Sequence, residues 1–145
     1  MNNITVSLQV ARSLRDAGWE QEDSSFYWGK FDPPKRRHLE DGTIVDIPKE
    51  EAEAMSYSWY YYNEENMPYA DEDHNSWAAP TAEEVLRELP EFYTPEDNKK
   101  RAMKCYPSAH GRWAVDYEGH CTQWSDTLAN AAAEMWIYLK EHDLL

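Results

Sequence analysis

The stretch of sequence that decides the fold is residues 125–143, SDTLANAAAEMWIYLKEHD. Its apolar residues recur every three or four positions, the spacing that places side chains on one face of an α-helix. They are Leu128, Ala131, Ala132, Met135 and Leu139, and the face is widened by Trp136 and Ile137. Ser125 or Asp126 is suited to cap the N-terminus of this helix. We therefore predict a helix from Thr127 to about Asp143 that forms the centre of the hydrophobic core.

Caps and apolar spacing indicate two further helices. Residues 6–18 begin with a candidate N-cap, Ser7, and end at Gly18, and the predicted buried face is Val10, Ala11, Leu14 and Ala17. In residues 78–90, AAPTAEEVLRELP, Thr81 and Glu84 have the spacing of a capping box and Pro90 ends the helix. Its predicted buried stripe is Val85, Leu86 and Leu89. A single helical turn is expected at residues 48–51.

The segments between these helices have the pattern of strands separated by polar turns. Strands are predicted at 25–31, 43–47, 56–63, 101–106, 112–118 and 120–124. The polar stretches 35–42, 63–76 and 94–100 are expected to be loops, with turns at Asp41-Gly42 and Glu118-Gly119. This order favours an α+β fold in which an antiparallel sheet carries the helices mainly on one face.

Length and composition favour one domain spanning residues 1–145. No stretch approaches the roughly 18 consecutive apolar residues of a membrane span, and the first residues lack the features of a signal peptide. Two Cys in a chain of this length do not form a disulfide scaffold. These features predict a soluble cytoplasmic protein without a cofactor.

The net charge of −14 is concentrated in the middle third of the chain. Residues 50–98 hold fourteen acids and one base, whereas residues 1–49 hold eight and seven, and residues 99–145 hold six of each. Aromatic residues are interleaved with these acids, so the region around 32–76 has the character of an acidic, aromatic-rich insertion. One interpretation is a solvated face that keeps the protein soluble. The other is a recognition surface, because aromatic residues are enriched in interface cores and clustered charge steers association.

A recognition surface of this kind predicts a basic host or phage protein as the partner. The candidate partner-binding residues are Trp59, Tyr61, Glu64, Glu65, Tyr69, Asp71, Glu72, Asp73 and Trp77. Direct binding to nucleic acid is disfavoured, because affinity for phosphates requires Lys and Arg. The same composition is compatible with a homo-oligomer.

Two groups of residues resemble metal sites, and neither is predicted to bind a metal. Cys105, His110, His120 and Cys121 lack the close pairs of structural zinc sites, and Cys105 is better explained as a small buried hydrophobic residue. Asp71, Asp73 and Asn75 match the first ligands of an EF-hand loop, but Ser76 and Ala82 stand where Gly and Glu are required.

Catalytic motifs are weak. Ser108 with His110, or Cys105 with His110 and Asp116, lacks the nucleophile elbow that would support a hydrolase. Asp116 and Glu118 are predicted to share an exposed strand face, an ordinary arrangement for solvated carboxylates. A hydrolase is therefore the least favoured interpretation.

Three segments together resemble a family of small acidic proteins encoded by tailed phages and prophages. They are VSLQVARSLRDAGWEQ at 6–21, AAPTAEEVLRELPEF at 78–92 and SDTLANAAAEMWIYLKEHDLL at 125–145. The resemblance implies a phage or mobile-element setting in the bacterial cytoplasm, and it implies no catalytic residues.

The leading hypothesis is a non-enzymatic interaction protein. In its specific form, the protein inhibits a host nucleic-acid-processing or defence protein, and the carboxylates of the middle third imitate a phosphate backbone. The alternative is a module that sequesters a nucleotide-like ligand. There a base would stack on Trp28, Trp59 or Trp77, and phosphate would meet residues 35–37 or 99–101.

Overall fold

The computed structural model describes residues 4–22, 24–30, 35–61, 76–94, 98–119 and 121–145. The helices are α1 (Leu8–Asp16), α2 (Lys49–Met55), α3 (Ala82–Glu88) and α4 (Leu128–Glu141). The strands are β1 (Phe26–Lys30), β2 (Arg36–His38), β3 (Ile44–Asp46), β4 (Tyr57–Tyr61), β5 (Ser76–Ala78), β6 (Phe92–Tyr93), β7 (Arg101–Pro107), β8 (Trp113–Tyr117) and β9 (Thr122–Ser125). The α+β fold class is confirmed. Among the described residues, no helix is long and apolar enough to cross a membrane.

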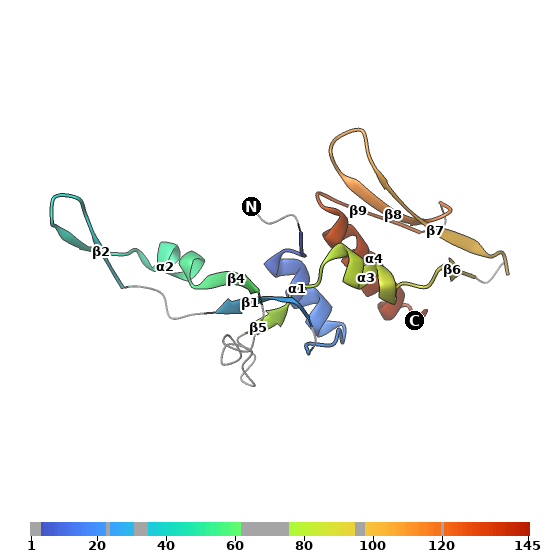
Figure 1. The fold of residues 1–145 in the computed structure, drawn as a ribbon, viewed down its shortest axis with the longest axis horizontal. Helices are drawn as coiled ribbons and strands as arrows, with labels where there is room; N and C mark the ends of the chain where they lie inside the picture. Colours follow the sequence, from blue (N-terminus) through green and yellow to red (C-terminus); the bar gives the residue numbers. More distant parts are fainter. Residues whose placement is uncertain (1–3, 23, 31–34, 62–75, 95–97, 120) are drawn as a thin grey trace.

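The described strands form three antiparallel sheets, ordered β4-β1-β5, β2-β3 and β6-β7-β8-β9 (Figure 1). The sequence pattern indicated antiparallel strands but not how they divide among sheets. The division follows from chain order, because β7, β8 and β9 are joined by short turns and pair with one another. β1 instead pairs with two strands that lie far apart in the sequence, β4 and β5.

Helix α4 is the centre of the core, as predicted from its spacing. It packs on β8 and β9 on one side and against α1 and α3 on others (Figure 1). Its burial therefore extends beyond the predicted face, and the buried residues are Ala129, Ala131, Ala132, Ala133, Met135, Trp136, Ile137 and Leu139. The expected cap was wrong: Thr127 is the N-cap, and its side chain accepts a hydrogen bond from the Asn130 amide at 3.1 Å.

The caps predicted for α1 and α3 are confirmed. The Ser7 hydroxyl accepts a hydrogen bond from the Val10 amide, and Gly18 follows α1 with φ +98°, which favours glycine. At α3, the Thr81 hydroxyl accepts from the Glu84 amide at 3.2 Å and the Glu84 carboxylate accepts from the Thr81 amide at 2.6 Å. These reciprocal bonds satisfy amides that the first helical turn leaves without partners.

Three tryptophans lie side by side across the sheet β4-β1-β5. Trp28 is paired directly with Trp59 on β4 and with Trp77 on β5, and all three pack partly against the core. The indole of Trp28 donates to the Val6 carbonyl at 3.0 Å, and that of Trp59 donates to the Thr5 hydroxyl at 2.9 Å. The segment before α1 thereby joins this sheet to the helical core.

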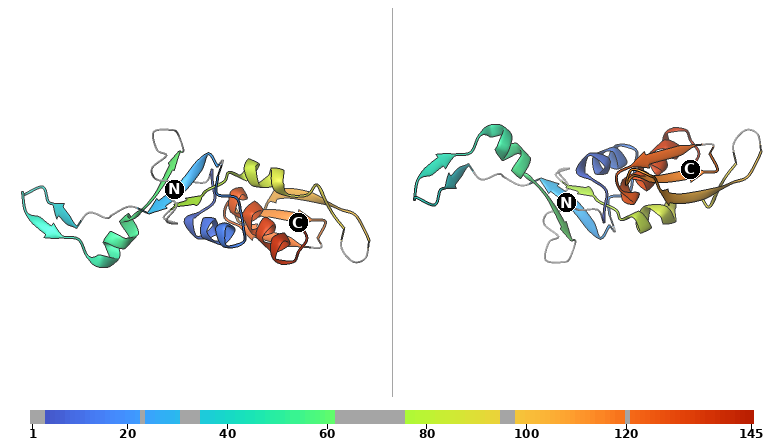
Figure 2. Two further views of the ribbon diagram at one scale, coloured as in Figure 1. Left: turned by 90° about the horizontal axis from the view of Figure 1, so that it is seen from below. Right: turned by 90° about the horizontal axis from the view of Figure 1, so that it is seen from above.

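The hairpin β2-β3 and helix α2 form an arm, residues 35–55, at the end of the molecule away from the core (Figure 2). The loop expected at 35–42 was wrong at Arg36–His38, which pairs with β3. This strand is exposed, and polar interactions rather than burial stabilise it. Arg36 and Asp46 form an ion pair at 3.6 Å across the hairpin, and in the turn the Asp41 carboxylate accepts a hydrogen bond from the Thr43 amide. The single turn expected at 48–51 is the longer α2.

Two short strands were not predicted. Ser76–Ala78 forms β5 because it pairs with β1, and Phe92–Tyr93 forms β6 because it pairs with the start of β7. Ser76, expected in an exposed loop, is buried. Both strands are too short for a periodic pattern to reveal them, and only the partner strand determines their conformation.

We expect the α3 cap to contribute measurable stability. Thr81→Ala removes the hydroxyl that accepts from the Glu84 amide, which costs about 1 kcal/mol of unfolding free energy. For a chain of this length, that loss lowers the melting temperature by about 3 °C. Thr81→Ser keeps the hydroxyl and is the matched control. Equal melting temperatures for Thr81→Ala and wild type would contradict the capping role.

Candidate functional site

The acidic, aromatic middle third was the predicted recognition surface. Six of its nine candidates, Glu64, Glu65, Tyr69, Asp71, Glu72 and Asp73, lie outside the described residues. The described candidates are Trp59 and Trp77, together with the backbone of Tyr61, which pairs with Phe26 at the end of β4. Residues 62–75 connect β4 with β5, and both of these strands pair with β1. The acidic segment therefore starts and ends on one sheet.

Trp59 and Trp77 both make contacts within the chain. The ring of Trp59 stacks on Phe26 with centroids 4.7 Å apart and planes 10° apart. The guanidinium of Arg12 lies 4.9 Å from the ring centroid of Trp77 and 4.9 Å from that of Tyr57. Cation–π contacts of this kind are worth about 0.5–1 kcal/mol at exposed sites. Both tryptophans are engaged within the chain on the strands that flank the acidic segment, and each offers a partner only its remaining exposed area.

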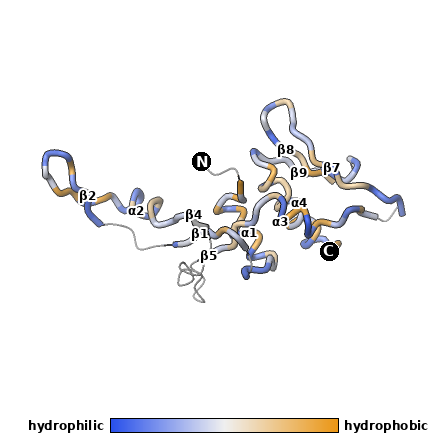
Figure 3. The backbone as a smooth tube through the Cα atoms, in the orientation of Figure 1, coloured by the Kyte–Doolittle hydropathy of each residue, from blue (hydrophilic) through white to orange (hydrophobic). Residues whose placement is uncertain are grey.

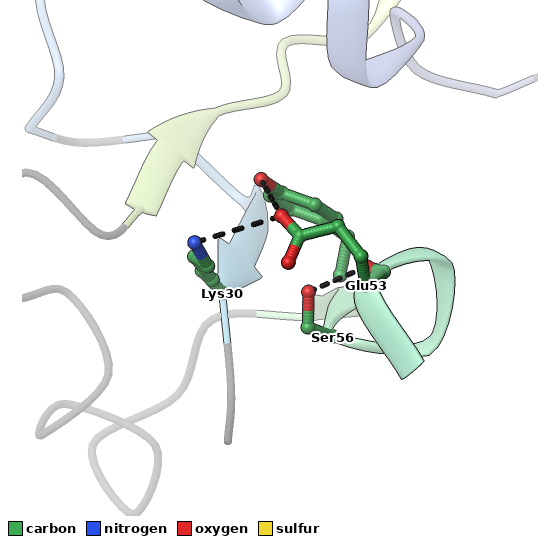
Figure 4. Close-up of polar contacts among 4 residues, drawn as sticks. Lys30, Glu53 and Ser56 are labelled. Carbon is green, nitrogen blue, oxygen red and sulfur yellow. Dashed lines mark hydrogen bonds and ion pairs between the residues drawn. The ribbon is translucent and has the colours of Figure 1, made fainter. Parts of the chain in front are cut away.

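The base of the arm is held by the Glu53 carboxylate (Figure 4). It forms an ion pair with Lys30 at 3.8 Å and accepts a hydrogen bond from the Tyr57 hydroxyl at 3.5 Å. The Ser56 hydroxyl donates to the Glu53 carbonyl at 2.6 Å (Figure 4). These contacts join α2 to β1 and β4. Within α2, Glu51 is also paired, with Arg37.

A cleft of about 310 Å³ lies between the α1–β1 connection and α3. Its lining residues are Trp19, Glu20, Glu22, Ser24, Pro80, Glu84, Arg87 and Glu88. Glu84 serves the α3 cap, and Arg87 pairs with Glu83 one turn away. The exposed carboxylates of Glu20, Glu22 and Glu88 complete the rim. The cleft is thus acidic, with one aromatic wall.

Trp19 forms that wall, and packing of α4 fixes its position. Its ring meets Trp136 edge to face, with centroids 5.0 Å apart and planes 79° apart. An aromatic face beside carboxylates suits a lysine or arginine side chain, which both attract. Sequence reasoning missed this cleft because its two walls are about 60 residues apart. The only sequence signal was the cluster Trp19-Glu20-Gln21-Glu22 directly after α1.

The metal-site candidates do not converge in the part of the chain that is described. No group of three or more His, Cys, Asp or Glu there is able to hold a metal ion. The EF-hand residues Asp71, Asp73 and Asn75, as well as His120, fall outside the described residues.

The two cysteines lie in different environments. The expectation of a buried Cys105 was wrong: Cys105 is exposed, whereas Cys121 is buried, with its Sγ 4.0 Å from Met135 Sδ. The reason is that α4 packs on β8 and β9, while Cys105 lies on the neighbouring β7. Desolvation raises the pKa of both thiols.

Asp116 was expected on an exposed strand face, and that was wrong. It is only 7% exposed, and its Oδ1 accepts hydrogen bonds from the Gly119 amide at 2.7 Å and the Thr122 hydroxyl at 3.0 Å. These bonds close the β8–β9 turn, in which Glu118 and Gly119 both have positive φ. Asp116 has the contacts of a structural turn residue, so its geometry lends no support to a hydrolase.

Comparison of the chain with protein-family models, with curated protein sequences and with solved structures gives no match.

Thiol labelling separates the two cysteines. In the native protein we expect one thiol, Cys105, to react with an aromatic disulfide reagent, and two to react in denaturant. Because the pKa of Cys105 is raised, its thiolate fraction is low at neutral pH and the labelling rate increases as pH rises toward that pKa. Cys105→Ser is the control and should label only after unfolding. Native labelling of Cys121 would contradict its burial.

Proposed function

We propose that this chain is a non-enzymatic interaction protein that binds a basic protein through its acidic surface. The observation that carries the proposal is the segregation of charge. Residues 50–98 hold fourteen acids against one base, and that base, Arg87, is paired with Glu83. A partner that approaches this third of the chain therefore meets almost exclusively negative charge, which raises its association rate and selects for Lys and Arg.

The described part of the acidic surface supports the same proposal. Glu50, Glu83, Glu88 and Glu91 are exposed on or beside α2 and α3. The acidic cleft adds the carboxylates of the α1–β1 connection and the Trp19 ring. A cationic side chain of the partner would enter this cleft, where carboxylates and an aromatic face act together. The exposed carboxylates around it would steer the approach.

The specific form of the proposal is inhibition by imitation of a nucleic acid. A row of carboxylates resembles the phosphate backbone in charge, and a nucleic-acid-processing protein holds its substrate with Lys and Arg. The resemblance to phage and prophage proteins supplies the setting: the cytoplasm of a bacterial host, where the target is a host nucleic-acid-processing or defence protein.

Capture of a nucleotide-like ligand is less well supported by the structure. Carboxylates at the rim of the cleft would repel phosphate. Arg36 and Arg37, considered as phosphate ligands, are paired with Asp46 and Glu51. Trp28 and Trp59, considered as stacking residues, use their indole N–H groups within the chain.

Charge reversal tests the acidic surface. We expect replacement of Glu64, Glu65, Asp71, Glu72 and Asp73 by Lys to leave the melting temperature near that of wild type. The variant should also associate at least tenfold more slowly with the host protein that wild type retains from bacterial lysate. Slower association is expected because clustered charge acts mainly on the encounter step. Wild-type binding itself should weaken steeply with added salt.

Two further variants sharpen the result. Replacement of Glu20, Glu22 and Glu88 by Lys tests the cleft alone. The matched control replaces Glu118, Asp126 and Glu141 by Lys. It changes the net charge by the same amount as the cleft variant, but in the C-terminal third. The proposal fails if the five-site variant associates at the wild-type rate, or if the control variant slows association as much as the cleft variant does.

A further inference from the structure

Large apolar side chains are exposed at two separate places. Apart from residues at the chain ends, the exposed large hydrophobic residues among those described fall into two groups. One is Leu39, Ile44, Val45 and Met55 on the arm, and the other is Phe92, Tyr106 and Trp124 on the sheet β6-β7-β8-β9. Exposed apolar groups that gather in this way mark interaction surfaces. The two groups lie at opposite ends of the molecule (Figures 1 and 3).

The first surface is the outer face of the sheet, opposite the side that packs on α4. Tyr106 on β7 and Trp124 on β9 are both paired with Ala114 on β8, so the three side chains point to the same face. The two rings meet edge to face with centroids 5.9 Å apart and leave Ala114 fully buried. Tyr106 is 37% exposed and Trp124 is 44% exposed. We call this surface the aromatic face.

The surroundings of the aromatic face are basic, in contrast to the chain as a whole. Residues 99–126 hold five bases and three acids. Lys104 is next to Tyr106 on the same face and is exposed. The acid that shares this face, Asp116, is buried and hydrogen-bonded to the β8–β9 turn. An apolar segment that carries carboxylates therefore complements the aromatic face.

The second surface is the tip of the arm, residues 39–45, LEDGTIV. It carries the exposed apolar residues Leu39, Ile44 and Val45, and it holds two acids and no base. The hydrogen bonds that Asp41 accepts from Thr43 lower the pKa of its carboxyl group, which therefore stays ionised at neutral pH. The tip thus combines apolar side chains with the negative charge that complements the basic surroundings of the aromatic face.

The hairpin of the arm lacks cover by other parts of the described chain. All residues of β2 and β3 are exposed, and an isolated two-stranded hairpin is only marginally stable in water. Its base is nevertheless held on the sheet β4-β1-β5, because Glu53 ties α2 to Lys30 and Tyr57. An anchored arm loses less conformational entropy when it docks than a free segment would.

We propose that the arm tip of one copy docks on the aromatic face of a second copy. Within one copy, the arm and this sheet lie at opposite ends (Figures 1 and 2). Between copies, Leu39 and Ile44 cover the Tyr106–Trp124 pair, and Glu40 meets Lys104. Because each copy has one tip and one face, the contact is head to tail and generates chains or closed rings.

Paired variants test this contact. The tip variant is Glu40→Lys with Ile44→Lys, and the face variant is Lys104→Glu with Trp124→Ala; all four side chains are exposed. By sedimentation velocity, wild type should exceed the mass of one chain, 17.1 kDa, increasingly at higher concentration. Each variant alone should sediment as a monomer. Its melting temperature should be close to that of wild type at a concentration low enough for wild type to be monomeric.

The decisive sample is an equal mixture of the two variants. The face variant keeps an intact tip and the tip variant keeps an intact face, so the mixture should form a dimer of one copy each and grow no further. Lys140→Glu with Leu145→Ala repeats the face variant's change of charge and truncates another exposed apolar side chain, away from both surfaces, and should associate like wild type. Wild type that stays monomeric at all concentrations, or a mixture that fails to dimerise, overturns the proposal. The acidic segment is unchanged in every sample, so failure here leaves the proposed function standing.

Discussion

Helix α4 must be buried on nearly all sides, and the rest of the structure is arranged to allow it. Four alanines in its first half permit close approach of neighbouring backbones, and the large side chains in its second half fill the core. A helix with this composition needs cover on more than one side, because its buried residues extend well beyond a single face. Strands β8 and β9 therefore cover one side, and α1 and α3 cover others.

The second sheet depends on that core through a short segment of chain. Thr5 and Val6 precede α1 and accept the indole hydrogen bonds of Trp59 and Trp28, while Thr5 also forms a β-bridge with Thr81 before α3. The Ser7 amide donates to the Asn130 side chain on α4 at 2.8 Å. Four elements thus meet at residues 5–7. This junction places the start and end of the acidic segment on a sheet that is fixed relative to α4.

The same architecture separates the charges of the chain in space. Acidic residues gather on α2, on α3 and around the cleft, whereas the outer face of the C-terminal sheet is locally basic. Such a distribution favours ordered association, either with a basic partner or between opposite ends of two copies.

The sequence by itself determined the elements that local physics governs. The apolar spacing of α4, the caps at Ser7 and Thr81, and the turns at Asp41-Gly42 and Glu118-Gly119 are contained in a few neighbouring residues. The α+β class follows from their order. The concentration of acid in the middle third is also a property of the sequence alone, and it carries the proposed function.

Only the tertiary structure decided which surfaces these elements create. Partner strands determine β2, β5 and β6, whose own residues show no strand pattern. Packing determines that Cys105 is exposed, because α4 covers β8 and β9, whereas Cys105 lies on β7. Asp116 is buried because its carboxylate accepts hydrogen bonds within the β8–β9 turn. The acidic cleft and the aromatic face each join residues that are distant in sequence. Their composition is visible in the chain, but their proximity results from the pairing of β7, β8 and β9 and from the packing of α1 and α3 on α4, which no local pattern encodes.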